Sequence, residues 1–424
     1  MTSNACSGSL DEIDLTSNDL FHLENHAAIF DRLREEDPVH FQKPSANAGG
    51  FWNITRYDDI MAVDTNHAMF SASGSMFIED MPDDFFVSMF LAMDPPRHTV
   101  YRSALRPAFT SEHIDSLQNE IRRRTRDTLD ALPIGEPFDW VERVSMDLTA
   151  HVLATLFDFP SEQRFKLIEW SDLAVLKTTR HADEIIDWEA RKQSFLHCLQ
   201  EFNQIKEARM GREGIDLVSL LATSHGDKPI KPSEFLGNLL MLMFAGSDTT
   251  RNSISGSVVA FERFPDQLRL FKENESLLPG AIQEVFRWQT PVAYMRRTAT
   301  RDCELGGKRV KAKDRVVMWY VSGNRDREMF DRPHEIDIAR PNISKHMAFG
   351  YGVHRCLGLR LAEMQMRILW QEIIERYERI ELLEEPTNVK STFIKGYSRL
   401  MVKLHPRRTA SSGIASAGSD RRSQ

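Results

Sequence analysis

Apolar residues recur at helical spacing along most of the 424-residue chain. The clearest run stands at intervals of three and four behind Leu357: Met366, Leu369, Trp370, Ile373 and Tyr377. This spacing predicts an amphipathic helix that packs one face on the core. Ser111 is expected to cap another helix that reaches Arg126, and residues 140–157 continue the same pattern. Helix therefore dominates the predicted structure.

Strand-like stretches are short by comparison. The pattern predicts strands at residues 50–55, 315–320 and 400–404, and a turn at Gly306–Gly307. No repeat of about 20 to 50 residues is visible, which excludes solenoids and propellers. We expect a mainly α fold with a smaller β-rich part, built as a single large domain over residues 19–406.

The two ends of the chain and its charge narrow the possibilities further. Residues 1–18 are expected to be flexible, and residues 407–424, which are rich in Ser, Ala, Gly and Arg without periodicity, are expected to be disordered. The 54 Lys and Arg against 62 Asp and Glu give a net charge of −8. Because no long basic tract supplies the electrostatic attraction that nucleic-acid binding requires, DNA and RNA are not expected partners.

The number and spacing of the cysteines and the hydropathy of the chain both favour a cytoplasmic location. Four scattered cysteines fit neither a disulfide framework nor a CxxC metal site. The start of the chain lacks the basic and apolar regions of a secretory signal, and no apolar run is long enough to cross a bilayer. We therefore expect a cytoplasmic protein without stable membrane insertion. We also expect it to be a monomer.

One predicted helix changes character abruptly. Residues 236–245 are apolar on nearly every side, as in a buried central helix, whereas residues 246–252 introduce Gly246, Asp248 and two threonines. Glycine inside a helix costs about 1 kcal/mol relative to alanine, and a buried carboxylate costs more unless it is paired or hydrated. Core helices seldom carry such a segment, so the change indicates a functional site.

A second candidate site surrounds Cys356. Gly350 and Gly352 permit backbone conformations that other residues resist, so the loop before Cys356 can turn tightly beneath a flat group. Cys356 stands just before the predicted helix, where the helix dipole and backbone N–H groups stabilise a thiolate, the ligand form of cysteine. The alternative, a small buried apolar residue, suits a lone cysteine better than one within the segment 349–358.

Four motifs carry a resemblance to a known family. They are Phe349-x-x-Gly352-x-x-x-Cys356-x-Gly358, Glu284-x-x-Arg287, Ala245-Gly246-Ser247-Asp248-Thr249-Thr250 and His98-x-x-x-Arg102. Their order along the chain and the distances between them are similar to those in the cytochrome P450 monooxygenases, in which a cysteine thiolate binds haem iron. The flanking segments are most similar to the soluble bacterial P450s that hydroxylate alkanes and fatty acids at the terminal carbon.

The resemblance implies haem b as cofactor, with Cys356 as the axial ligand of the iron. It assigns the following residues to the haem site: His98, Arg102, Ala245, Gly246, Arg297, Phe349, Gly350, His354, Cys356 and Gly358. The two histidines and two arginines of this set would contact the haem propionates. The guanidinium fork of arginine suits a carboxylate.

The same resemblance predicts a buried scaffold. Glu284 and Arg287 stand three apart on a helix and would pair with Arg340 beneath the haem loop. Removing one partner from such a network costs about 3–5 kcal/mol because an ion is left unpaired. Arg296, by contrast, is expected to be an ordinary surface residue.

Asp248 and Thr249 are the catalytic candidates that the resemblance implies. Activation of dioxygen needs protons without free entry of solvent. Thr249 would hold oxygen and a water, Asp248 would relay protons from the surface, and Gly246 would leave room for dioxygen. Alternatively, the Thr249 hydroxyl bonds back to the Ala245 carbonyl oxygen and merely bends the helix, and the two roles can coexist.

Apolar side chains crowd residues 76–93, a segment that lies over the haem in this family. The resemblance assigns these positions to the substrate pocket: Phe86, Val87, Leu242, Ala245, Val292 and Phe393. Plain core packing is the alternative interpretation of the crowded segment. Because none of the assigned residues is a polar clamp, we expect an apolar substrate that gains about 0.8 kcal/mol per buried CH2 group.

These expectations combine into one reaction. The chain is expected to use dioxygen to hydroxylate an apolar substrate at the terminal methyl of a medium-chain alkane, fatty acid or related chain. No flavin domain accompanies the motifs, so electrons are expected from outside the chain. The resemblance implies a [2Fe–2S] ferredoxin and its NAD(P)H-dependent reductase as the source, which Arg355 and Arg360 could meet. The alternatives are a terpene-like substrate, a non-catalytic haem-thiolate sensor, a peroxide-driven hydroxylase and a cysteine hydrolase built on Cys356.

Overall fold

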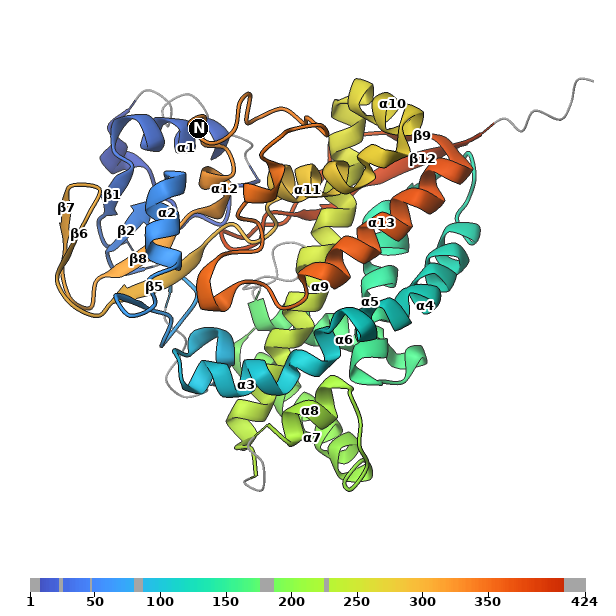
Figure 1. The fold of residues 1–424 in the computed structure, drawn as a ribbon, viewed down its shortest axis with the longest axis horizontal. Helices are drawn as coiled ribbons and strands as arrows, with labels where there is room; N and C mark the ends of the chain where they lie inside the picture. Colours follow the sequence, from blue (N-terminus) through green and yellow to red (C-terminus); the bar gives the residue numbers. More distant parts are fainter. Residues whose placement is uncertain are drawn as a thin grey trace, which may run out of the picture.

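A computed structural model describes residues 8–22, 26–45, 48–79, 87–175, 187–224 and 229–407 of the chain. Helices make up most of the body (Figure 1). The α-helices are α1 (His26–Glu36), α2 (Tyr57–Asp64), α3 (Arg97–Leu105), α4 (Ser111–Asp130), α5 (Asp147–Phe157), α6 (Phe165–Val175), α7 (Trp188–Ala208), α8 (Leu217–Ala222), α9 (Pro232–Arg263), α10 (Pro265–Glu273), α11 (Leu278–Gln289), α12 (Tyr320–Gly323) and α13 (Leu359–Arg376). The strands are β1 (Val39–Gln42), β2 (Phe51–Ile54), β3 (Phe70–Ser71), β4 (Pro137–Asp139), β5 (Met295–Ala299), β6 (Cys303–Leu305), β7 (Lys308–Val310), β8 (Arg315–Met318), β9 (Tyr377–Leu382), β10 (Thr387–Asn388), β11 (Tyr397–Arg399) and β12 (Met401–Pro406). The predicted fold, mainly α with a smaller β-rich part, is confirmed.

The largest sheet lies beside the helical body, at the left of Figure 1. Its strands follow the order β1-β2-β8-β5-β3, with β2 parallel to β8 and the other neighbours antiparallel. β4, β12 and β9 form a second, antiparallel sheet. Gly306 and Gly307 join β6 to β7 with φ angles of 53° and 74°, which glycine adopts readily. The three predicted strands are confirmed as β2, β8 and β12, and so is this turn, although β8 ends at Met318 and Tyr320 already begins α12.

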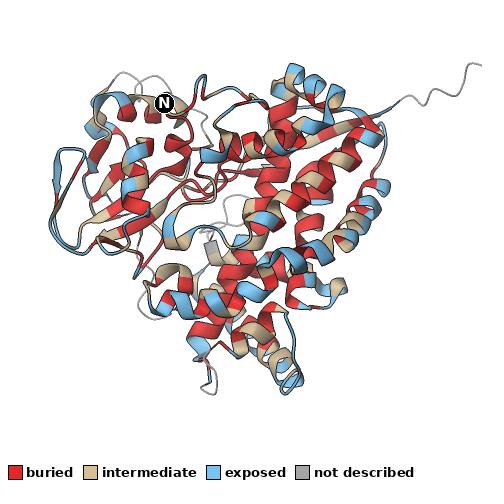
Figure 2. Ribbon diagram, viewed as in Figure 1, coloured by how far each residue is buried: buried red, intermediate tan, exposed pale blue. Residues whose placement is uncertain are grey.

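Helix α9 crosses the middle of the molecule and is buried over most of its length (Figures 1 and 2). Helices α5, α6 and α11 pack against it. It continues without interruption through residues 246–252, so the change of composition there is not a change of backbone. Ala245 is exposed although Phe244 and Ser247 are buried, because it borders an internal cavity.

Helix boundaries differ from the sequence expectations in two places. Thr110, rather than Ser111, caps α4, since its hydroxyl accepts the His113 N–H at 3.3 Å. A π-helical turn, Val141–Met146, precedes α5, so residues 140–157 do not form one regular helix. The helix predicted behind Leu357 is confirmed as α13.

The packed body begins before the expected boundary at residue 19. Ile13 and Leu15 are buried in the same core cluster as Phe30 and Phe51. Residues 1–7 and 408–424, on which the other expectations for the two ends fall, lie outside the described residues.

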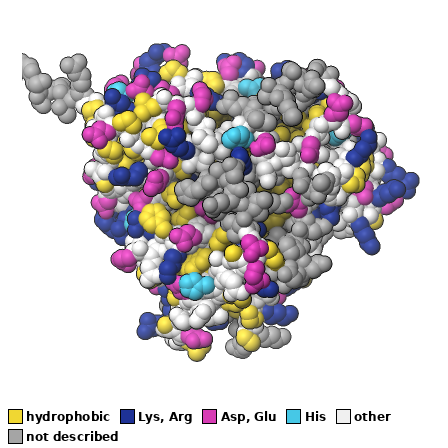
Figure 3. All heavy atoms as spheres, turned by 180° about the vertical axis from the view of Figure 1, so that it is seen from behind, with side chains coloured by type: hydrophobic (Ala, Val, Ile, Leu, Met, Phe, Trp, Pro, Cys, Tyr) yellow, Lys and Arg dark blue, Asp and Glu magenta, His cyan; other side chains and the backbone are white. Residues whose placement is uncertain are grey.

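Among the helices that the structure describes, none combines the length and the apolar composition needed to cross a bilayer. On the face seen in Figure 3, basic and acidic side chains are interspersed.

Candidate active site

A cavity lies between α9 and the loop that carries Cys356. Ala245, Gly246 and Thr249 line it from the helix, and Cys356 lines it from the loop. The cavity encloses about 1420 Å³ of space not filled by atoms, part of it open to solvent. The two segments that the sequence singles out, far apart in the chain, therefore meet at one site.

The cysteine loop turns as its glycines require. Gly350 and Gly352 have φ angles of 62° and 65°, which residues with a Cβ atom adopt at a cost. The Cys356 N–H donates to the Phe349 carbonyl oxygen at 2.9 Å. The Phe349 ring packs edge-on against Phe286 of α11, with the ring centroids 4.9 Å apart. These contacts hold the loop in place, and the thiol is accessible to the cavity.

Burial and the nearby polar groups shift the pKa of the Cys356 thiol in opposite directions. Burial raises its pKa, whereas the N–H of Gly358, the charges of Arg102 and Arg355, and the N–H of Leu359 lower it. Burial dominates, so the pKa lies above its usual value. A coordinating metal deprotonates a thiol outright, and the N–H groups and cations around the sulfur fit a metal-bound thiolate.

Two histidines and two arginines gather at one end of the cavity. The ring centroids of His98 and His354 are 4.3 Å apart, and none of their ring nitrogens has a hydrogen-bond partner among the described residues. Burial, followed by the charge of Arg102, lowers the pKa of His98 to about 4. Burial, followed by the charge of Arg297, lowers the pKa of His354 to about 2. Buried polar groups normally have partners, so this set fits the two carboxylates of a haem.

The two arginines are held by different elements. Arg102 of α3 donates to the Arg355 carbonyl oxygen at 2.7 Å and so connects α3 to the cysteine loop. Arg297 of β5 donates to the carboxylate of Asp64 at 3.0 Å, and both side chains are buried. Sequence reasoning missed Asp64. The sequence feature that could have indicated it is that Asp64 is an acidic residue on the otherwise apolar buried face of α2.

Thr249 and Asp248 have different surroundings. Thr249 lines the cavity, and its hydroxyl donates to the Ala245 carbonyl oxygen at 2.8 Å, the back-bonded arrangement that the sequence leaves open. Asp248 is buried and pairs with Arg251, which also contacts Asp172 of α6 at 3.2 Å. A proton path through Asp248 would therefore include an ion pair that sequence reasoning did not foresee.

Gly246 has a packing role in addition to its place in the cavity wall. A Cβ atom at this position would lie 2.7 Å from Cδ2 of Leu153 in α5. The glycine therefore permits the close approach of α5 and α9. The sequence predicted only the other use, which is space for dioxygen.

The predicted pocket residues only partly reach the cavity surface. Those that line it are Leu242, Ala245 and Val292. Val87 is buried in the same core cluster as Phe90, and Phe393 packs behind Phe244 with the ring centroids 5.7 Å apart. Phe90 and Phe244 line the cavity instead. Phe86 lies outside the described residues.

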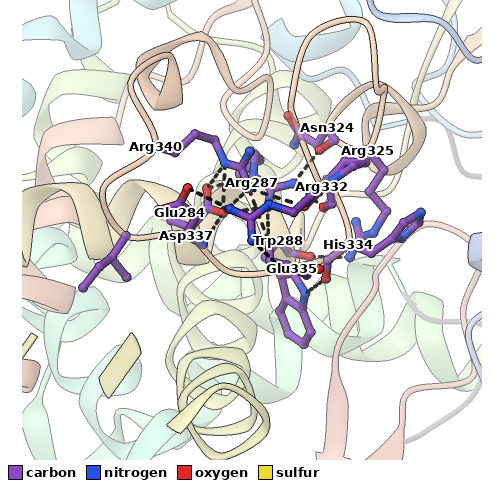
Figure 4. A network of polar contacts seen from close by, with 12 residues as sticks. Glu284, Arg287, Trp288, Asn324, Arg325, Arg332, His334, Glu335, Asp337 and Arg340 are labelled. Atoms are coloured by element: carbon purple, nitrogen blue, oxygen red, sulfur yellow. Dashed lines mark hydrogen bonds and ion pairs between the residues drawn. The ribbon is translucent and has the colours of Figure 1, made fainter. Parts of the chain in front are cut away.

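The structure brings Glu284, Arg287 and Arg340 together in one network of hydrogen bonds and ion pairs (Figure 4). Glu284 accepts from Arg287 at 2.7 Å and from Arg340 at 3.1 Å. Arg287 also donates to the carbonyl oxygens of Asn324 at 2.8 Å and Pro333 at 2.6 Å. Burial raises the pKa of Glu284, but the two arginines outweigh it and the pKa lies below its usual value. The network ties α11 to the segment that follows α12.

Arg296 differs from its expected role as a surface residue. It is buried, and its guanidinium donates to the carbonyl oxygens of Phe77 at 3.1 Å and Ile78 at 3.4 Å. The side chain therefore holds a segment of the apolar stretch 76–93 against β5.

Comparisons with known proteins agree with this geometry. A family model described as Cytochrome P450 matches residues 272–404. Linalool 8-monooxygenase of Pseudomonas putida is 32% identical over 410 residues, which cover 93% of this chain and 99% of that protein. A methyl-branched lipid omega-hydroxylase of Mycobacterium tuberculosis is 30% identical over 407 residues, 92% of this chain and 94% of that protein. The solved structure of cytochrome P450-153 from Novosphingobium aromaticivorans matches with a TM-score of 0.86 at 40% identity, covering 92% of this chain and 99% of that one.

Proposed function

The chain belongs to the cytochrome P450 family, and on this premise we propose that it hydroxylates the terminal methyl group of a medium-chain alkane, fatty acid or related chain. Membership makes it a haem-thiolate monooxygenase of apolar substrates. The observation that carries the finer proposal is the mainly apolar cavity that joins Cys356 to α9. The similarity to a lipid omega-hydroxylase supports attack at a chain end.

Bound haem supplies the activation of dioxygen and the insertion of one oxygen atom into a C–H bond. The overall reaction consumes dioxygen, two electrons and two protons, and it releases water with the alcohol. We assign the iron ligand to Cys356 and the propionate contacts to the histidines and arginines at the end of the cavity: His98, Arg102, Arg297 and His354. Phe349 and Gly350 shape the loop that would hold the cofactor.

Substrate orientation follows from the distribution of polarity in the cavity. The charged side chains that line it, Arg102, Arg297 and Asp64, belong to the propionate end. The apolar wall includes Phe90, Leu91, Met241, Leu242 and Phe244. An alkyl chain against this wall would gain about 0.8 kcal/mol per buried CH2 group without desolvating a charge, so we expect the chain to lie along the apolar wall rather than at the charged end.

Proton supply is assigned to Thr249 and Asp248. The Thr249 hydroxyl donates to Ala245, so its two lone pairs remain available to a donor in the cavity. Asp248 sits one residue earlier on α9 and is connected through Arg251 to half-buried Asp172. Asp248, Arg251 and Asp172 thus form a polar connection from α9 to α6, and none of the three lines the apolar cavity.

Electrons are assigned to a [2Fe–2S] ferredoxin served by an NAD(P)H-dependent reductase. A surface depression next to the cysteine loop is lined by Arg102, Arg106 and Arg360 together with Leu357. Three arginines around one depression favour an acidic partner and speed its encounter. A donor bound at this depression would lie next to the loop that carries Cys356.

A spin-state titration across a chain-length series tests the proposal, followed by identification of the products. We expect medium-length alkanes and fatty acids to shift the spin state most and to yield primary alcohols. Linalool belongs in the series because linalool 8-monooxygenase makes a terpene-like substrate the second candidate. Preferential binding of linalool, or secondary alcohols as the main products, would contradict terminal hydroxylation of a linear chain.

A further inference from the structure

A buried carboxylate lies against the cysteine loop, outside every motif that the sequence shows. Asp64 ends α2 and is 2% exposed. The other buried residues of this helix, Tyr57, Ile60 and Val63, pack in the core cluster beside the large sheet. A carboxylate in such surroundings is costly unless donors compensate it. Its partners therefore indicate what it does.

Donors from three different segments converge on Asp64. One carboxylate oxygen, Oδ1, accepts from Nη2 of Arg297 at 3.0 Å. The other, Oδ2, accepts from the Tyr320 hydroxyl at 2.8 Å and from the Tyr351 backbone N–H at 2.8 Å. These donors belong to β5, α12 and the cysteine loop. Asp64 thus connects three parts of the cavity wall, and it lines the cavity itself.

Close packing links the position of Asp64 to that of the loop. A Cβ atom at Gly352 would lie 2.5 Å from the Asp64 carbonyl oxygen, and one at Gly350 would lie 3.5 Å from Oδ2. Both glycines also have positive φ angles. The residues that let the cysteine loop turn therefore also let the end of α2 approach it.

The charges around Arg297 give this contact an electrostatic consequence. Arg297 is 4% exposed, and Asp64 is its ion-pair partner. Burial, followed by the charge of Asp64, raises the pKa of Tyr320 well above its usual value, so the hydroxyl remains a neutral donor. The carboxylate offsets the field of the guanidinium across the cavity, where charges act strongly because the surroundings are poorly polarisable. Without that carboxylate, the full positive charge of Arg297 would favour the reduced, less positive state of a nearby iron.

We propose that Asp64 is a positioning residue that fixes Arg297 and the cysteine loop and, by offsetting the charge of Arg297, lowers the reduction potential of the haem iron. This inference rests on the proposed haem site. It extends that proposal by assigning control of the potential to a residue outside the haem-binding motifs. The same carboxylate would then affect both the position of the cysteine loop and the reduction potential of the iron.

Asp64→Asn tests the proposal, since it preserves the shape of the side chain and removes its charge. A redox titration of the haem-loaded variant, followed by its absorption spectrum, is expected to show a more positive potential than the wild-type protein. Asp58→Asn is the matched control, because Asp58 is an exposed acid on the same helix. Its potential is expected to equal that of the wild type.

Tyr320→Phe is the second variant, and it keeps the proposal testable if Asp64→Asn does not bind haem. It removes one donor from the carboxylate and leaves the negative charge in place, so the potential is expected to move to more negative values. An unchanged or lower potential in Asp64→Asn, or a raised one in Tyr320→Phe, would overturn the role of Asp64. Wild-type protein without a thiolate-type spectrum would overturn the haem site itself, and the two failures are therefore distinguishable.

Discussion

The Thr249 hydroxyl uses its proton in one hydrogen bond and keeps its acceptor lone pairs for another. It donates to the Ala245 carbonyl oxygen at 2.8 Å, and a hydroxyl retains two acceptor lone pairs after donating. Because Thr249 lines the cavity beside Gly246, those lone pairs are accessible to a donor in the reaction space. One group can therefore serve both the helix and the site.

Replacing this hydroxyl is expected to separate binding from chemistry. Thr249→Ala should leave the substrate-induced spin shift unchanged, because no apolar wall residue is lost. It should lower the yield of alcohol per NAD(P)H and raise that of peroxide, because protons are no longer delivered in step with electrons. Product and peroxide per NAD(P)H are the quantities to measure.

Thr155 provides the control for this experiment. Its hydroxyl makes the same back-bond, to the His151 carbonyl oxygen at 3.0 Å, on the exposed side of α5. Thr155→Ala is expected to retain wild-type coupling. An unchanged coupling ratio in Thr249→Ala would remove Thr249 from the proton path and leave it as a helix residue.

Sequence reasoning succeeds best for residues whose roles depend on near neighbours. Gly350 and Gly352 stand close to Cys356, and the positive φ angles observed for them follow from that local pattern. Asp64 and Arg251 could not be found in this way. Their significance comes from partners on other elements, and nothing in the flanking residues indicates which distant side chain will meet them.

At the scale of elements, the buried ion network ties α11 to the segment that follows α12, and Phe286 of the same helix packs against Phe349 of the cysteine loop. Glu284→Ala would leave Arg287 and Arg340 without their shared carboxylate, at a cost of about 3–5 kcal/mol. We therefore expect a lower melting temperature and little haem-loaded protein, measured as haem per polypeptide. Glu273→Ala, at an exposed end of α10, should behave as the wild type, and normal haem loading of Glu284→Ala would exclude the scaffold role.

A second ion cluster joins α13 to α4 and predicts a pH dependence. Glu372 accepts from Arg122 at 2.8 Å, from Arg126 at 3.0 Å and also from Arg376 at 2.5 Å. Burial raises the pKa of Glu372, but the three arginines outweigh it and lower the pKa to about 2, against a usual 4.5. Because the folded-state pKa is depressed, the stabilisation is present above pH 4.5 and is lost as the pH falls toward 2.

Thermal unfolding at several pH values measures this contribution. Glu372→Gln is expected to lower the melting temperature at pH 7 and to flatten its decline between about pH 4.5 and pH 2. Glu375→Gln, at an exposed position of the same helix, should keep the wild-type profile. A variant at position 372 that declines as steeply as the wild type would show that other carboxylates dominate acid unfolding.

At the scale of the whole molecule, the resemblance did not predict which side chains line the cavity. The motifs predicted which segments meet, but not which side chains face the space between them. Val87 is buried in the core and Phe393 packs against Phe244, whereas Phe90 and Phe244 line the cavity. Which side chains face the cavity depends on how helices and loops rotate as they pack, and position in the chain alone does not determine that rotation.

The carbon monoxide spectrum of the reduced protein tests the central claim, which is a bond between the sulfur of Cys356 and haem iron. The wild-type protein and Cys303→Ser, which replaces a half-buried cysteine of β6, are expected to show the long-wavelength Soret band typical of thiolate ligation. Cys356→Ser is expected to lose that band. Its absence from freshly prepared, haem-loaded wild-type protein, or its persistence in Cys356→Ser, would contradict the account.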